Sequence, residues 1–263
     1  MPRLKRGLWM LGALGVLALG APAIQMPAAQ LREAPLPAAQ LPLVDSAAIA
    51  SRAQAAFFAG DVEELRKLAA VSAAWAKSTG SSEQYTHAYV QFRLLQWAIS
   101  QKRKGDAENA GEACTATLDV AVKRDPRFTE GYALQSACYG YLAGLGGFAA
   151  IGNGSRSGKS IEAAVKLDAR NPRVILVNGF GVYFRPKFVG GDKDRGCVLF
   201  RSAAAAFDSV SNSTAVSWGA PEAHLWAGRC ASDAGDAPGA QREWARALAL
   251  APDFLAAKRR LTH

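Results

Sequence analysis

The glycine-rich segment 152–160, which reads G-N-G-S-R-S-G-K-S, is the stretch whose residues come nearest to a recognisable chemistry. Its end, Gly158-Lys159-Ser160, matches the end of a phosphate-binding loop, whose pattern is G-x-x-x-x-G-K-S/T. That pattern also needs a glycine where this chain has Asn153, and it needs a buried strand before the loop. Neither requirement is met. We therefore expect no nucleotide site, and we interpret the segment as a long Gly/Ser-rich loop between two helices.

Other catalytic patterns are missing from the sequence. It contains no G-x-S-x-G and no H-E-x-x-H, and no cysteine has a histidine nearby. His87 stands between Tyr85 and Tyr89 in a helical segment, and His224 lies beside the packed face of another helix, so both are expected to be packed or surface residues. The four cysteines are too widely spaced for a zinc site built from C-x-x-C pairs. We predict a protein that is not an enzyme and that has no cofactor and no metal.

The net charge of +9 is spread along the 263 residues. Short basic clusters occur at 102–104 and 258–260, both near predicted helix C-termini, where the helix dipole favours cations. No platform of aromatic and basic residues accompanies them, as a nucleic-acid surface would require. Nucleic acid is therefore not the expected partner.

The N-terminus has the layout of an export signal. Arg3, Lys5 and Arg6 precede the apolar run 8–19, whose 12 residues are too few to span a bilayer, and an Ala-Pro-Ala cleavage site follows at 21–23. We predict a signal peptide over residues 1–23, with an uncleaved anchor as the alternative. Residues 24–44, rich in Pro, Ala and Gln, are expected to form a flexible linker. The mature chain is expected in the periplasm or outside a bacterial cell, without a membrane span.

A helical domain is predicted over 45–263, because helical segments recur there with regular punctuation. Gly-Asp pairs are separated by 45, 86 and 44 residues, which indicates a period of about 44 residues with one mark missing. These pairs stand at 60–61, 105–106, 191–192 and 235–236. The predicted helix pairs are 45–59 with 61–78, 82–104 with 106–124, 127–145 with 157–169, 172–184 with 192–210, and 220–234 with 236–250. A terminal helix is expected at 253–262.

The segment 221–254 carries a specific pattern of small and aromatic residues at the places where two helices of a hairpin would touch. The residues concerned are Gly228, Ala240, Trp244, Ala247 and Pro252. On these residues the segment resembles a tetratricopeptide repeat, and the resemblance extends loosely over 82–254. It implies an all-α, right-handed solenoid of about five helical hairpins. HEAT-like repeats are the alternative, because the period of about 44 residues suits them as well.

In such a solenoid the first helix of each hairpin lines a concave groove, and the resemblance implies that this groove binds a protein or peptide. The residues expected there are Tyr141, Arg173, Phe180, Tyr183, Phe184 and Arg229. The aromatic residues could equally belong to the core, and both interpretations stay open; arginines beside aromatics are typical of an interaction surface. The predicted function is a non-catalytic exported adaptor for a protein or peptide partner. The alternative is a small-ligand-binding component that accompanies solute transport.

The same arrangement of helices suggests how the cysteines pair. Cys114 falls at a small-residue position in the second helix of one pair, and Cys138 lies in the first helix of the next; Cys197 and Cys230 repeat this relation one residue out of phase. Adjacent helices bring such positions close enough for a bridge. We predict the disulfides Cys114–Cys138 and Cys197–Cys230, which an exported protein can keep. Four buried free thiols are the alternative.

Overall fold

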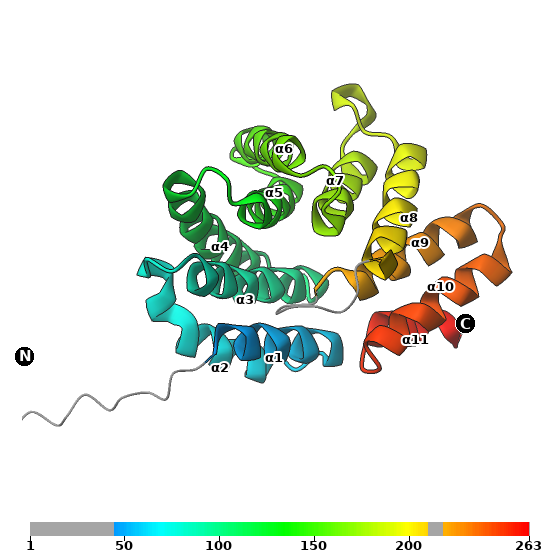
Figure 1. Cartoon of the computed structure of the whole chain (residues 1–263), viewed down its shortest axis with the longest axis horizontal. Helices are drawn as coiled ribbons and strands as arrows, with labels where there is room; N and C mark the ends of the chain where they lie inside the picture. Colours follow the sequence, from blue (N-terminus) through cyan, green and yellow to red (C-terminus); the bar gives the residue numbers. More distant parts are fainter. Residues whose placement is uncertain (1–44, 210–217, 263) are drawn as a thin grey trace, which may run out of the picture. The chain divides into compact units, whose positions relative to one another are not determined.

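A computed structural model describes residues 45–209 and 218–262, which belong to the unit Leu43–His263 (Figure 1). The predicted signal peptide and linker, residues 1–44, lie outside the described residues. Within the described residues the chain forms helices joined by turns and no strand. The α-helices are α1 (Ser46–Ala59), α2 (Val62–Ser72), α3 (Ser81–Ser100), α4 (Lys104–Arg124), α5 (Thr129–Gly144), α6 (Ala150–Leu167), α7 (Pro172–Phe184), α8 (Lys193–Ser209), α9 (Ala220–Asp233), α10 (Ala237–Leu250) and α11 (Leu255–Leu261). The 3-10 helices are η1 (Ala73–Lys77) and η2 (Lys187–Val189).

Gly-Asp pairs separate helices as predicted at three of the four positions. Gly60 ends α1 in the left-handed conformation with φ 77°, and the Asp61 carboxylate accepts a hydrogen bond from the Glu64 amide at 3.0 Å. Gly235 has φ 81°, and Asp236 caps α10 in the same way. The glycine relieves the steric cost of positive φ, and the aspartate satisfies an amide that the helix leaves unpaired. The pair at 191–192 likewise precedes α8.

The pair at 105–106 behaves differently and corrects one predicted boundary. α3 ends at Ser100 rather than at residue 104, and Gly105 lies inside α4. Lys102 makes the turn with φ 57°, and the Arg103 amide donates to the Ala98 carbonyl at 2.8 Å. This hydrogen bond closes α3 early, so the left-handed residue of the turn comes three positions before the glycine.

Consecutive helices pack as hairpins, namely α3 with α4, α5 with α6, α7 with α8, and α9 with α10. Glycine permits the close contact inside two of these hairpins. A Cβ atom at Gly228 would lie 2.5 Å from Trp244 Nε1, and one at Gly196 would lie 2.7 Å from Tyr183 Cβ. The core follows the inner sides of the helices, with one buried cluster mainly over α1 to α7 and a second over α7 to α9. The predicted all-α hairpin architecture is confirmed.

Helix α6 corrects the interpretation of the glycine-rich segment. Residues 152–160 lie inside a helix that begins at Ala150, so they do not form the expected loop. Contacts with α5 stabilise this helix despite its glycines: the Ser136 and Ser157 hydroxyls each donate to the other residue's carbonyl at 2.9 Å, and Ser160 donates to Gln135 at 2.6 Å. The segment lacks the loop conformation that presents backbone amides to a phosphate.

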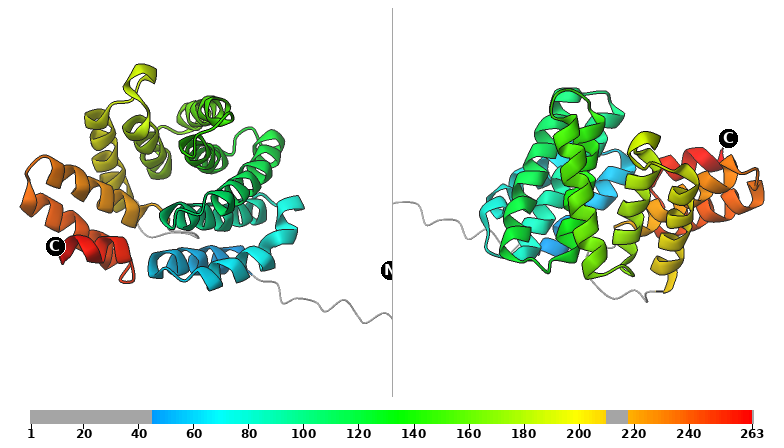
Figure 2. Two further views of the ribbon diagram at one scale, coloured as in Figure 1. Left: turned by 180° about the vertical axis from the view of Figure 1, so that it is seen from behind. Right: turned by 90° about the horizontal axis from the view of Figure 1, so that it is seen from above.

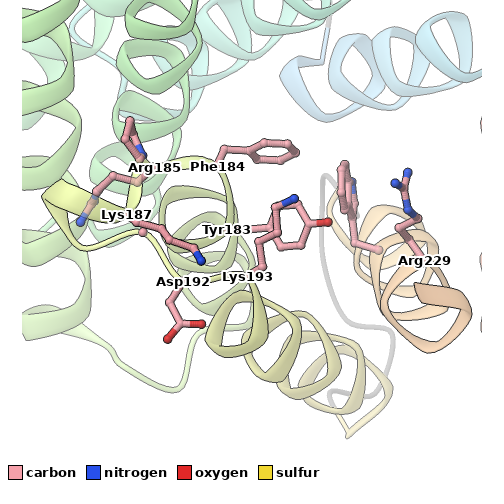
Figure 3. A pocket seen from close by; sticks show the side chains of 10 residues that line it. Tyr183, Phe184, Arg185, Lys187, Asp192, Lys193 and Arg229 are labelled. Carbon is pink, nitrogen blue, oxygen red and sulfur yellow. The ribbon is translucent and has the colours of Figure 1, made fainter. Parts of the chain in front are cut away.

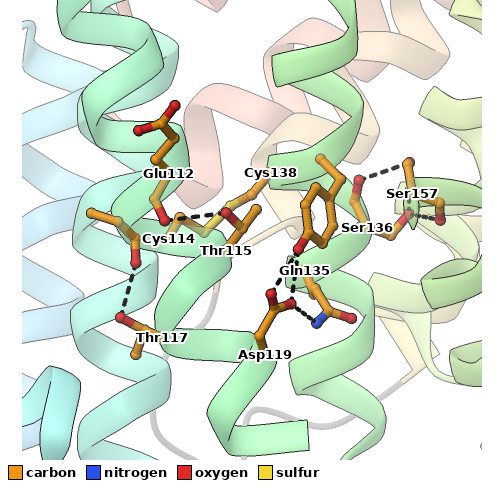
Figure 4. Close-up of a disulfide and its surroundings, with 11 residues drawn as sticks. Glu112, Cys114, Thr115, Thr117, Asp119, Gln135, Ser136, Cys138 and Ser157 are labelled. Atoms are coloured by element: carbon orange, nitrogen blue, oxygen red, sulfur yellow. Dashed lines mark hydrogen bonds between the residues drawn. A yellow bond between two sulfur atoms is a disulfide. The ribbon is translucent and has the colours of Figure 1, made fainter. Parts of the chain in front are cut away.

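Both predicted disulfides are present in the structure. Cys114 and Cys138 join α4 to α5 with a Cα–Cα distance of 6.4 Å, and Cys197 and Cys230 join α8 to α9 at 5.6 Å. Figure 4 shows the first bridge beside a polar cluster in which Asp119 accepts hydrogen bonds from neighbouring side chains. Each bridge links the second helix of one hairpin to the first helix of the next.

The last helix packs against the first. The rings of Phe58 in α1 and Phe254 before α11 lie 4.1 Å apart, in a buried cluster with Ala247, Ala251 and Ala257. Figure 1 and the left view of Figure 2 both place α11 beside α1. The first and last parts of the helical unit therefore share one apolar contact.

Candidate binding site

A fully buried arginine occupies the space between the inner helices. The Nη2 atom of Arg93 in α3 lies 2.5 Å from a carboxylate oxygen of Glu222 in α9, and its Nε donates to the Tyr89 hydroxyl at 2.8 Å. The guanidinium also lies 4.5 Å from the centre of the Phe57 ring. The other Glu222 oxygen accepts from the Gly219 amide at 3.0 Å. The buried charges are thus paired and hydrogen-bonded, as burial of ions requires.

Trp218 fills the space next to this ion pair. Its indole Nε1 donates to the Tyr85 hydroxyl at 2.8 Å, and its ring stacks on Tyr89 at 5.8 Å between centroids. Burial, and then the charge of Glu130, raise the pKa of Tyr85 well above its ordinary value. The Tyr85 hydroxyl therefore stays protonated and donates to Glu130 at 3.3 Å.

Tyr141 and Arg173, two of the predicted groove residues, belong to this interior. Arg173 pairs with Glu130 at 3.1 Å and donates to the Trp218 carbonyl at 2.9 Å. The Tyr141 hydroxyl accepts from Gln96 at 3.1 Å. The chain's own side chains thus fill the space between α3, α5 and α9. Trp218 and the Arg93–Glu222 pair occupy this part of the space in which the resemblance implied a groove.

An open cleft of about 440 Å³ lies beside the end of α7 (Figure 3). Its walls come from the last turn of α7, the turn 185–192, the start of α8, and α9. Trp226 of α9 forms one side, and its ring contacts Tyr183 at 5.5 Å and Phe184 at 5.2 Å. Tyr183 is buried, whereas Phe184 is 61% exposed, so the cleft has an apolar wall that solvent reaches.

Basic side chains surround the apolar wall. Arg185 and Lys187 form no ion pair with any carboxylate of residues 45–209 and 218–262, and the Lys193 ammonium lies 5.7 Å from the centre of the Tyr183 ring. Arg229 donates to Asp233 at 3.0 Å on the exposed face of α9. Asp192 is the acidic residue of the lining. The cleft therefore presents aromatic surface together with positive charge that the protein does not fully neutralise.

No protein-family model matches the sequence, and no curated protein matches it. Solved structures do share its architecture. A thermophilic tetratricopeptide-repeat protein from Thermus thermophilus has a TM-score of 0.53 and 17% identity, over 83% of this chain and 97% of that one. The HusA haemophore from Porphyromonas gingivalis has a TM-score of 0.58 and 19% identity, over 72% of this chain and 94% of that one. The fold is that of tetratricopeptide-repeat proteins.

The six predicted groove residues occupy three places in the structure. Tyr141 and Arg173 lie in the filled interior, whereas Tyr183, Phe184 and Arg229 line the cleft. Phe180 lies behind the cleft wall, where its ring contacts Phe200 at 5.0 Å and Trp226. The two interpretations left open by the sequence thus both apply, core for some of these residues and surface for others. Their part in binding a partner stays a prediction.

Sequence reasoning missed Trp226 and the basic residues of the turn. Trp226 lies three positions before the predicted groove residue Arg229 in α9, so the two residues share one side of that helix. Arg185 and Lys187 belong to the turn 185–192 between α7 and α8. The two positive charges of that turn, next to Phe184, are the signal that could have placed a site there.

His87 and His224 lie away from the cleft. Nδ1 of His87 lies 3.0 Å from the Ser72 hydroxyl, and the buried His224 has its Nδ1 2.7 Å from Glu243. Within the described ranges, no cluster of three or more His, Cys, Asp or Glu side chains could hold a metal ion. None of the helices in these ranges has both the length and the apolar character needed to cross a bilayer.

Proposed function

We propose that this protein is an exported, non-catalytic adaptor, and that its cleft binds a peptide segment with apolar side chains and a carboxylate. The observation that carries the proposal is the aromatic wall formed by the exposed Phe184 and the partly buried Trp226. It lies beside Arg185 and Lys187, which lack carboxylate partners among the described residues. Aromatic residues and arginine dominate binding energy at protein contacts. Carboxylates form the strongest hydrogen bonds with such cations.

Export is part of the proposal and rests on independent observations. The N-terminus reads as a signal peptide over 1–23, and both cysteine pairs form disulfides, which persist in oxidising compartments. The intact mass of protein recovered from the periplasm of an expression host decides whether the chain is exported and its signal peptide cleaved. A chain beginning near Ile24 supports export with cleavage, whereas a chain that keeps residues 1–23 contradicts the cleavage.

The binding proposal is tested with peptides selected from a random library that ends in free carboxylates. The selected peptides should be apolar with an acidic residue or a free C-terminus. Replacing the carboxylate by an amide, or Lys187 by Ala, should weaken binding by about tenfold, the loss expected for one charged hydrogen bond. Lys258→Ala is the matched control, because Lys258 is an exposed cation on α11, outside the cleft lining. An equal loss of peptide affinity in Lys187→Ala and Lys258→Ala contradicts the proposal, and so does an unchanged affinity in Lys187→Ala.

A small apolar anion is the second candidate. The specific support is the volume of the cleft, about 440 Å³, which is in the range of small-molecule sites. One protein with this fold is named a haemophore, so haem, a planar apolar molecule with two carboxylates, is the probe of choice. Haem titration followed by visible absorbance should give a saturable shift that Lys187→Ala weakens and Lys258→Ala does not. If no saturable binding is seen, haem is excluded as a ligand, and the peptide proposal is decided by the peptide experiment alone.

A further inference from the structure

Two turns of the helical unit carry exposed large apolar side chains. Between α5 and α6, Phe148 is 108% exposed, and Ile151, in the first turn of α6, is 87% exposed. In η2, Phe188 is 89% exposed and Val189 is 51% exposed. Single exposed apolar residues are ordinary on protein surfaces, but a concentration of them marks a contact surface.

Both turns lie at the same end of their hairpins. Each connects the first helix of a hairpin to the second, and α5 packs beside α7. The right view of Figure 2 shows the turn between α5 and α6 and the turn with η2 at that same end. The turn between α3 and α4 also closes a hairpin and so belongs to this edge. We call these three turns, residues 101–103, 145–149 and 185–192, the hairpin edge.

The hairpin edge carries more basic than acidic residues. The turn 101–103 holds Lys102 and Arg103, the turn 185–192 holds Arg185, Lys187 and Asp192, and the turn 145–149 is uncharged. The turns at the opposite end differ, since 125–128 and 168–171 each hold one acidic and one basic residue. Positive charge therefore accompanies the exposed apolar residues at one end of the hairpins.

We propose that the hairpin edge docks on the surface of an anionic lipid membrane. Phe148, Phe188 and Val189 enter the boundary between headgroups and acyl chains, together with Ile151 from the adjoining first turn of α6, and the basic side chains contact lipid phosphates. Apolar residues beside Lys and Arg are the combination that holds proteins in this layer, where each basic residue near the surface adds to the attraction. Phe188 directly follows Lys187 of the cleft, so docking places the cleft mouth next to the lipid.

The form of the turns favours lipid over a protein partner. Gly146, Gly147 and Gly190 adopt positive φ, and a Cβ at any of them would meet no atom within 4 Å. The turns therefore project outward as narrow tips. Protein contacts instead concentrate their energy in well-packed, desolvated pockets at the centre of an interface. The proposal does not depend on what the cleft binds.

Co-sedimentation of the full chain with lipid vesicles tests the proposal. Parent protein should bind vesicles of phosphatidylcholine with phosphatidylglycerol, should bind pure phosphatidylcholine more weakly, and should lose affinity as salt rises. The double variant Phe148→Ser/Phe188→Ser should bind the anionic vesicles at least about tenfold more weakly, because two large apolar side chains no longer enter the lipid. Both proteins carry the same N-terminus, so its apolar run contributes equally.

The matched control is Val71→Ser/Val120→Ser, which removes two valines that are 49% and 52% exposed on α2 and α4. This control should bind anionic vesicles as the parent does, and both double variants should keep the parent melting temperature. Equal vesicle binding by the parent and the Phe148/Phe188 variant overturns the proposal. So does a parent that binds no anionic vesicles, or a variant that loses self-association while its lipid binding is unchanged, which would assign the edge to a protein contact.

Discussion

The guanidinium of Arg93 lies 2.5 Å from the carboxylate of Glu222, although 129 positions separate the two residues in the chain. This pair joins the second hairpin to the fifth, and Tyr89 and Trp218 pack around it. Because the pair is buried, removing one partner should destabilise the fold, since an unpaired charge costs far more free energy in the interior than at the surface. The filled interior therefore depends on both partners being present.

Glu222→Gln should lower the free energy of unfolding by about 3–5 kcal/mol, because it leaves the buried Arg93 without a countercharge. Urea unfolding measures the loss. Glu64→Gln is the control, since the Arg52–Glu64 pair has side chains that are 58% and 24% exposed. The control should cost less than about 1 kcal/mol. Similar losses of unfolding free energy in the two variants would show that the buried Arg93–Glu222 pair stabilises the fold no more than an exposed pair does.

Gly228→Ala should destabilise the protein by about 1–3 kcal/mol, because the added methyl overpacks the contact with Trp244. Gly158→Ala, inside α6, is the comparison, since a Cβ there meets nothing within 4 Å. It should stabilise by about 0.5–1 kcal/mol through helix propensity alone. Thermal unfolding should show a lower melting temperature for Gly228→Ala and a higher one for Gly158→Ala. A neutral Gly228→Ala contradicts the close helix contact.

Stability should fall below about pH 6.5, the ordinary pKa of histidine, with His87 as one cause. Burial lowers the pKa of His87, so the unfolded chain takes up a proton at a higher pH than the folded chain does. The contribution is complete above the unfolded pKa and is lost as the pH falls through the folded one. His87→Gln should flatten this part of the stability profile in urea unfolding from about pH 8 to pH 5. An unchanged slope contradicts the assignment.

Denatured, unreduced protein should show no free thiol, and reduction should release four, because both cysteine pairs are bridged. Each bridge should stabilise the fold by about 3–4 kcal/mol, since the loops they close span 24 and 33 residues. Replacing one pair by alanines at a time, followed by chemical unfolding, separates the two contributions. Four reactive thiols before reduction would refute both bridges.

Tyr183→Ala and Phe184→Ala should separate core from cleft surface. Tyr183 is 9% exposed against Phe200 and Trp226, so its removal should cost about 3–5 kcal/mol. Phe184 is 61% exposed, and its removal should cost less than about 1 kcal/mol while weakening binding in the cleft. Calorimetry measures the first effect and peptide titration the second. A reversed order of the two stabilities contradicts this division.

Local sequence patterns predicted the hairpins well, because their determinants are close together in the chain. The contact of Gly228 with Trp244 and the cap of Asp236 involve residues fewer than twenty positions apart. The start of α6, residues 150–156, was missed for a related reason. Its glycines lower helix propensity, and the bonds of Ser157 and Ser160 to α5 that compensate are tertiary contacts, which a single segment does not reveal.

The interior and the cleft could be predicted only in part, because they depend on distant residues. Nothing near Arg93 in the sequence indicates that its guanidinium will pair with Glu222, or that Trp218 will stack on the nearby Tyr89. Two predicted groove residues therefore lie in a filled interior. The cleft needs α7, the turn 185–192 and α9 to come together. The sequence indicated Tyr183, Phe184 and Arg229 but not Trp226.

The contact of Phe58 with Phe254 gives this repeat protein a different folding behaviour from an open array. Repeats that touch only their neighbours can melt one at a time from either end. Here the outermost helices hold each other, so fraying at one end also loosens the other, and unfolding becomes more nearly all-or-none. During synthesis Phe58 stays uncovered until Phe254 has been made, and Arg93 stays without its partner until Glu222 has been made.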